Sequence, residues 1–183
     1  DEQVSKYLCA LFDIYLKRLQ AGEPVAYITH EKEFFGLNFF VDKRVLVPRC
    51  ETELLVEKII EYVDSQSHEG TRLRVLDVGT GSGNIAVALA RYFEDNGLDL
   101  IDEIVAVDID FAAIEVAKIN IEQHTVDHKV NVFQSDLLEV VEDNEFFDVI
   151  VANLPYIGEV KNRSVSANVE KHEPNKALFA GND

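Results

Sequence analysis

The stretch VLDVGTGSGNIAVALA contains a candidate ligand-binding loop, made of Gly79, Thr80, Gly81, Ser82 and Gly83. Glycines allow positive φ and let the backbone approach a ligand closely. Their G-x-G-x-G spacing differs from the G-x-G-x-x-G of dinucleotide-binding folds. Asp77 precedes the loop, and its carboxylate argues against a bound phosphate and favours a cationic group, such as an ammonium or a sulfonium.

Further acids follow the next two predicted strands. Asp108 ends the strand in DEIVAVDID, where a carboxylate can accept hydrogen bonds from both hydroxyls of a ribose. Asp136 and Leu137 end the strand in KVNVFQSDLL and could flank an adenine through one polar and one apolar contact. Taken singly, each feature also fits a tight turn or a helix cap. Ligands of open α/β sheets lie at the carboxyl ends of the strands, so their shared position favours one binding site.

A third motif, Asn153-Leu154-Pro155-Tyr156, follows the apolar run FFDVIVA. A loop needs polarity and a proline to end a strand, but it does not need Asn, Pro and Tyr at this spacing. Because this strand is expected to end beside the glycine loop, we expect Asn153 to face the bound ligand.

The elements that position these motifs alternate from Leu73 onward. Apolar strand-like runs are separated by the helical patterns NIAVALARYFEDN and FAAIEVAKINIEQH, which predicts an α/β fold with a parallel sheet, right-handed crossovers and helices on both faces. Upstream, the periodicity predicts a helix over residues 2–20, a β-hairpin turning near Gly36, and a helix over CETELLVEKIIEYVDS with Leu54, Leu55, Ile59 and Val63 on its apolar face.

Composition narrows the classes of function. The 183 residues are 47% hydrophobic and carry a net charge of −17, which disfavours nucleic acid as a partner. The two cysteines have the spacing of neither a disulfide framework nor a metal site. His124 and His128 are expected to be solvent-exposed side chains rather than metal ligands. No apolar run reaches the roughly 18 residues of a membrane span, so we expect a cytoplasmic protein without bound metal.

The stretches LDVGTGSG, AVDID and SDLL together resemble the nucleotide-binding half of class I S-adenosylmethionine-dependent methyltransferases. The resemblance implies a Rossmann-like sheet and S-adenosylmethionine as cofactor. Asp77 and residues 79–83 would surround its amino-acid end, Asp108 would hold its ribose, and Asp136 and Leu137 would lie near its adenine.

The Asn-Leu-Pro-Tyr motif resembles the (N/D/S)-P-P-(Y/F/W) signature of methyltransferases that modify planar nitrogens. The resemblance implies that the Asn153 side chain and the Leu154 carbonyl accept hydrogen bonds from the target N–H groups, close to the methyl donor. Tyr156 would pack on the planar group, and Pro155 would keep Leu154 extended.

The linker EPVAYITHEKEFFGLNFFVDKRVLVPRCETELLVE is similar to that of the HemK/PrmC family, the protein-(glutamine-N5) methyltransferases that modify the Gly-Gly-Gln loop of peptide chain release factors. EPNKALFAGND resembles the family's segment after the catalytic loop. The resemblance implies three parts: the end of a helical substrate-recognition domain (1–22), a hairpin linker (23–50) and the methyltransferase domain (51–183), with its closing strands missing. Cys50 and Leu154 stand where the family usually has proline.

Several alternatives stay open at this point. An Asn-(Leu/Ile)-Pro-Tyr motif also resembles RNA adenine dimethyltransferases, so an adenine N6-methyltransferase acting on RNA or DNA is one rival, and an idle cofactor-binding module is another. Arg49 or Glu51 could shape the substrate entrance, and Phe34 or Phe35 could contact the cofactor rather than only pack in the hairpin. The oligomeric state is left open.

Overall fold

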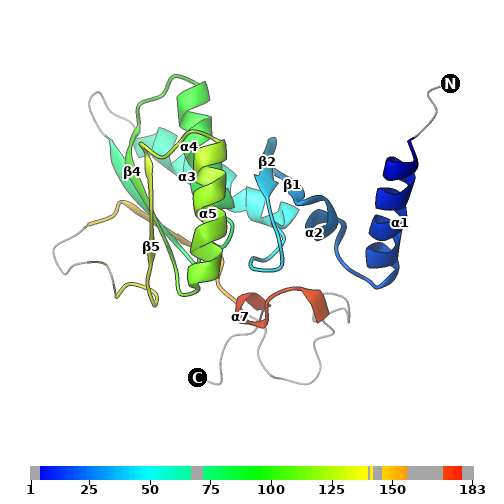
Figure 1. Cartoon of the computed structure of the whole chain (residues 1–183). Helices are drawn as coiled ribbons and strands as arrows, with labels where there is room; N and C mark the ends of the chain where they lie inside the picture. The colour runs from blue at the N-terminus through cyan, green and yellow to red at the C-terminus, as the bar shows by residue number, and fades with distance from the viewer. Residues whose placement is uncertain (1–4, 67–71, 140, 142–145, 156–170, 179–183) are drawn as a thin grey trace.

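A four-stranded parallel sheet forms the centre of the molecule (Figure 1). This computed structural model describes residues 5–66, 72–139, 141, 146–155 and 171–178. The strands β3 (Leu73–Val78), β4 (Ile101–Asp108), β5 (Val130–Gln134) and β6 (Val149–Ala152) lie in the order β5-β4-β3-β6. The predicted α/β fold with a parallel sheet is therefore confirmed.

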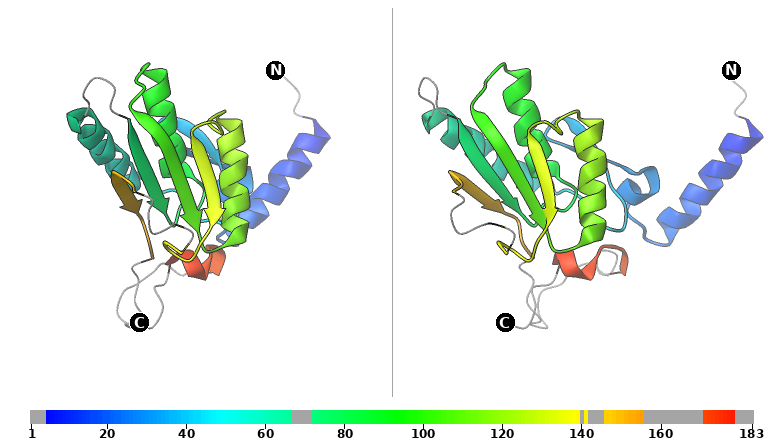
Figure 2. Two further views of the ribbon diagram at one scale, coloured as in Figure 1. Left: turned by 90° about the vertical axis from the view of Figure 1, so that its left-hand side faces the viewer. Right: turned by 60° about the vertical axis from the view of Figure 1, so that its left-hand side comes forward.

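One face of the sheet carries the helices α3 (Glu53–Gln66), α4 (Asn84–Asp95) and α5 (Phe111–Gln123), as Figure 2 shows. We expected helices on both faces. In the described residues the other face is covered by non-helical chain, since Val141 and Phe147 pack against buried side chains there: Leu76, Val78, Val105 and Val107. A right-handed return from β5 to β6 must cross this second face, which explains why Val141 and Phe147, both from this connection, pack there.

The ends of the helices follow from local chemistry. Asp110 caps α5, because its side chain accepts a hydrogen bond from the Ala112 amide. Gly83, in a left-handed conformation, precedes α4. A side chain at this position would press against Ala117 of α5, so this glycine also permits close packing of the two helices.

The apolar face of α3 differs from the predicted one. Leu54 is 56% exposed, whereas the buried residues of the helix are Val56, Ile59, Ile60 and Val63. Their i, i+3, i+4, i+7 spacing defines one stripe, and Leu54 lies two residues before its first member, on the opposite side of the helix. The prediction for Leu54 was wrong, and Ile59 and Val63 were assigned correctly.

The N-terminal region contains α1 (Lys6–Gln20), α2 (Val25–Thr29) and a hairpin of β1 (Glu31–Phe34) and β2 (Leu37–Phe40). The predicted hairpin is confirmed, and both turn residues, Phe35 and Gly36, have positive φ. The short helix α2 was not predicted. Helix α1 stands apart from the sheet in Figures 1 and 2 and has no buried residue.

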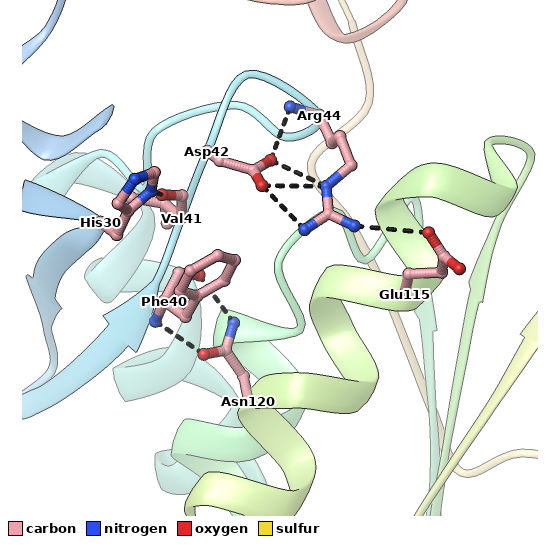
Figure 3. A network of polar contacts seen from close by, with 7 residues as sticks. All are labelled: His30, Phe40, Val41, Asp42, Arg44, Glu115 and Asn120. Carbon is pink, nitrogen blue, oxygen red and sulfur yellow. Dashed lines mark hydrogen bonds and ion pairs between the residues drawn. The ribbon is translucent and has the colours of Figure 1, made fainter. Parts of the chain in front are cut away.

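The hairpin is joined to the sheet domain through buried contacts (Figure 3). Asn120 of α5 is fully buried, accepts a hydrogen bond from the Phe40 amide at 2.7 Å, and donates to the Phe40 carbonyl at 3.0 Å. Phe34 and Phe39 are also fully buried in the main core. Phe34 and Phe35 do not line the cavity described below, so the structure assigns both to packing.

None of the described helices is long and apolar enough to cross a membrane.

Candidate functional site

A cavity of about 660 Å³ lies at the carboxyl ends of the four strands. It is lined by most of the residues singled out in the sequence: Gly79, Thr80, Gly81, Ser82, Asp108, Asp136, Leu137, Asn153, Leu154 and Pro155. Asp77 and Gly83 do not line it, and Tyr156 lies outside the described residues. The structure thus brings the three predicted motifs together at one edge of the sheet.

The glycine loop is fixed by the neighbouring strand. The amides of Gly79 and Thr80 both donate to the Val107 carbonyl of β4, at 2.8 and 2.9 Å. Gly81 has a φ of 56°, and a Cβ built on it would meet nothing within 4 Å. Bare backbone therefore faces the cavity here, at the start of α4, where the helix dipole adds partial positive charge.

Asp108 links the end of β4 to this loop. Its Oδ2 accepts a hydrogen bond from the Gly81 amide at 2.9 Å, and its Oδ1 accepts one from the Asp110 amide at 2.9 Å. Burial raises the pKa of Asp108, the amides of Asp110 and Gly81 oppose this, and the charge of Asp110 adds to it. Each oxygen keeps a second acceptor site, which suits a pair of ligand hydroxyls.

Asp77 lies beneath the loop rather than in the cavity. It is fully buried, and its Oδ2 accepts a hydrogen bond from the Thr80 hydroxyl at 2.6 Å. Burial raises the pKa of Asp77 to about 6, with a further contribution from the charge of Asp108, whereas the Thr80 hydroxyl and the Ala86 amide oppose the shift. Direct contact of Asp77 with a ligand, which we expected, is replaced in this structure by support of Thr80.

Leu137 has a strained backbone in the cavity wall. Its φ is +50°, a region that branched side chains rarely adopt. The side chain is 53% exposed and lines the cavity beside Asp136. Backbone strain of this kind is concentrated at ligand sites. The exposed Leu137 side chain gives the cavity an apolar wall that could contact a planar ring of a ligand.

Three residues of the Asn153 motif, Asn153 to Pro155, also line the cavity. Asn153 lines the cavity, and its Nδ2 donates to the Thr52 hydroxyl at 3.2 Å. Leu154 also lies against the glycine loop, since a Cβ on Gly79 would come within 2.7 Å of its Cδ2. Asn153 and Leu154 therefore both line the cavity, and the Leu154 side chain lies against the glycine loop.

Sequence reasoning named one further residue of the cavity wall and missed others. Of the two candidates for the substrate entrance, Arg49 lines the cavity and Glu51 does not. Thr52 and Lys176 of α7 (Asn175–Leu178) also line it and were not predicted. Arg49 Nη2 lies 2.6 Å from Oε1 of Glu173, whose side chain is nearly fully buried. The family-like linker and the EPNKALF segment indicated that both regions matter, but only the fold pairs residues 124 positions apart.

A family model described as ribosomal protein L11 methyltransferase (PrmA) matches residues 52–157. Curated relatives include a release factor glutamine methyltransferase of Koribacter versatilis, 40% identical over 94% of this chain and 57% of its own length. Another, from Rhodopirellula baltica, is 38% identical over 92% of this chain and 55% of its own length. The chain therefore spans a little over half the length of these relatives.

Among solved structures, the N-terminal domain of human METTL16 in complex with SAH is similar, with a TM-score of 0.51 and 25% identity. The similarity covers 69% of this chain and 49% of that one. The sheet and its helices are thus shared with a methyltransferase structure, as the residues of the glycine loop predicted.

Proposed function

This chain belongs to the PrmA-type methyltransferase family, and from that premise we propose that it methylates a glutamine side-chain amide in a peptide chain release factor. The proposed methyl donor is S-adenosylmethionine, and the target is the glutamine of a Gly-Gly-Gln motif. The extent of the sequence similarity supports this substrate, because the alignments with relatives named release factor glutamine methyltransferase cover 92–94% of this chain.

The observation that carries the proposal is the position of Asn153 and Leu154 in the cavity wall beside the glycine loop. An amide nitrogen is a weak nucleophile, because its lone pair is delocalised into the carbonyl. Two acceptors that receive hydrogen bonds from its N–H groups stabilise the positive charge that develops on the nitrogen in the transition state. They also hold the nitrogen in line with the bond between the methyl group and the sulfur. Asn153 would supply a side-chain acceptor, Leu154 a backbone carbonyl, and Tyr156 a surface for the planar group.

The cavity also has the chemistry that the proposed donor requires. S-adenosylmethionine supplies a methyl group on a positively charged sulfur. Open backbone at Gly81, acceptor oxygens at Asp108 and an apolar wall at Leu137 would hold its amino acid, ribose and adenine parts. The METTL16 domain, which has the same fold, is described in complex with SAH, the product left after methyl transfer.

We propose the same three parts as the sequence analysis: the end of a helical substrate-recognition domain at 1–22, a linker at 23–50, and the methyltransferase domain at 51–183. Helix α1 supports this division. Its apolar side chains Tyr7, Leu8 and Phe12 are exposed, and none of its residues is buried against the described part of the chain. A release factor substrate also implies a cytoplasmic location, where translation ends.

The main rival is methylation of adenine in RNA or DNA. The net charge of −17 argues against it, because nucleic-acid binding depends on phosphate neutralisation by Lys and Arg. The basic side chains in the cavity wall are also partly neutralised, since Arg49 is paired with Glu173 and Arg44 with Asp42.

The test is transfer of labelled methyl from S-adenosylmethionine to purified release factor and, in parallel, to ribosomal RNA. We expect label in the release factor only, and a loss of roughly 100-fold or more for Asn153→Ala, because it removes one of the two acceptors. Asn38→Ala, in the hairpin outside the cavity, is the matched control. Label in RNA alone would contradict the substrate, and equal inertness of wild type and Asn153→Ala would favour an idle binding module.

A further inference from the structure

The turn that follows the linker contacts the Asn153 motif through one side chain, that of Thr52. Asn153 Nδ2 donates to Thr52 Oγ1 at 3.2 Å, although the two residues lie 101 positions apart. Among the described residues this is the one side-chain hydrogen bond of Asn153. Thr52 is 7% exposed and also lines the cavity, so its hydroxyl lies in the protein interior next to the proposed reaction site.

Thr52 sits on a well-supported element. It ends the 3₁₀ turn η1 (Cys50–Thr52), and its amide donates to the Arg49 carbonyl at 3.1 Å. Helix α3 follows directly and buries Val56 and Ile59 in the main core. A hydroxyl on such an element is held in place by packing.

The preceding residues are anchored from the other end of the chain. Glu173 binds the Arg49 guanidinium through Oε1 and accepts a hydrogen bond from the Val47 amide at Oε2, at 3.3 Å. The Glu173 side chain is almost completely buried. The turn that carries Thr52 is therefore fixed on both sides.

The contact matters because an asparagine amide has two different ends. Its oxygen accepts hydrogen bonds and its NH₂ group only donates. A glutamine amide that must be bound through its own N–H groups needs the oxygen of Asn153 turned toward it. An amide rotated by half a turn would present N–H to N–H and would repel the substrate. In this structure the Thr52 hydroxyl accepts from Nδ2, and this arrangement leaves Oδ1 of Asn153 free to accept from the target amide.

We propose that Thr52 is a positioning residue, whose hydroxyl accepts a hydrogen bond from Asn153 Nδ2 and so directs Oδ1 of Asn153 at the target amide. The inference rests on the proposed function for its kinetic consequence. It assigns a chemical task to the segment Pro-Arg-Cys-Glu-Thr-Glu (48–53), where the linker meets the domain: the segment joins the two parts and also orients the acceptor in the cavity.

The test compares Thr52→Val, which keeps the shape but lacks the hydroxyl, with Thr52→Ser, which keeps the hydroxyl. We expect kcat for release factor methylation to fall roughly 10- to 100-fold in Thr52→Val, with KM for the cofactor unchanged, because misplacement of an orienting group acts on the transition state. Thr52→Ser should recover kcat to within about threefold of wild type. A purely structural role would instead change the melting temperature in parallel with the loss of activity.

A second measurement does not depend on turnover. The Asn153 side-chain NH₂ signals in a ¹H–¹⁵N spectrum, identified by their loss in Asn153→Asp, should shift and exchange faster in Thr52→Val but not in Thr52→Ser. Unchanged signals in Thr52→Val, or equal kcat for Thr52→Val and wild type, would overturn the inference. If wild type transfers no methyl to the release factor while the signals do change, the proposed function fails and the orientation by Thr52 stands.

Discussion

Replacement of Asp77 by Asn tests the structure beneath the glycine loop. The carboxyl group is fully buried, its Oδ1 makes no hydrogen bond among the described residues, and its pKa is raised from 3.8 to about 6. An asparagine has the same shape, carries no charge, and can still accept the hydrogen bond from the Thr80 hydroxyl. The substitution therefore removes the buried charge and leaves the support of the loop in place.

The magnitude follows from proton linkage. Asp77 has a higher pKa in the folded state than in the unfolded state, so the folded state binds more protons between these values. Stability is therefore greatest below the unfolded pKa and falls as pH rises through the folded pKa. A shift of about two units at about 1.4 kcal/mol per unit gives a cost of about 3 kcal/mol at neutral pH.

The assay is urea unfolding of wild type and Asp77→Asn at a series of pH values. The unfolding free energy of the variant minus that of wild type should increase by about 2 kcal/mol between about pH 4.5 and about pH 7.5. Asp102→Asn, at an exposed position of β4, is the control for the change in net charge. A difference that stays constant with pH, or follows the control, would refute the buried, protonatable state of Asp77.

Two further predictions concern the loop and the linker. Gly79→Ala should lower methyl transfer more than Gly36→Ala, because φ is nearly the same at both, +74° and +75°, but only at Gly79 does the new Cβ meet Leu154, at 2.7 Å. Similar activity in the two variants, measured by labelled transfer, would contradict this. Asn120→Ala should lower the unfolding free energy by about 3 kcal/mol or more, since it leaves both polar groups of the Phe40 backbone and the Ser82 carbonyl without their buried partner. Gln123→Ala, which loses one exposed hydrogen bond on the same helix, should cost well under half of that in the same urea titration, and equal costs would argue against the buried bridge.

The sheet and the edge where the motifs meet were predictable, because periodic apolar runs and glycine spacing are local signals. The apolar strand VLDV is followed by Gly79, and the apolar strand IVAV is followed by Asp108. Because the carboxyl ends of parallel strands meet at one edge of the sheet, these residues were expected to lie together. The structure confirms the four strands and α4 and α5 close to their predicted bounds. Helix α2 was missed because its sequence, VAYIT, is rich in β-branched residues, and its helical form depends on burial of Tyr27 and Ile28.

The rest of the site depends on contacts between distant parts of the chain. The sequence places Asp77 beside the loop, but only the fold shows that its carboxylate is fully buried and accepts a hydrogen bond from the Thr80 hydroxyl. The pairing of Thr52 with Asn153, and of Arg49 with Glu173, joins segments more than 100 positions apart. Local pattern carries no information about such pairs, so Thr52 and Glu173 could be identified as the partners of Asn153 and Arg49 only from the fold.

The most direct test of the account is the atom that receives the methyl group. Tandem mass spectrometry of release factor incubated with the protein and S-adenosylmethionine should locate one added methyl on the side-chain amide of the Gly-Gly-Gln glutamine. The same reaction with Asn153→Ala should leave that peptide unmodified. A methyl found on a lysine, an arginine or a chain terminus instead would contradict the amide chemistry assigned to Asn153 and Leu154.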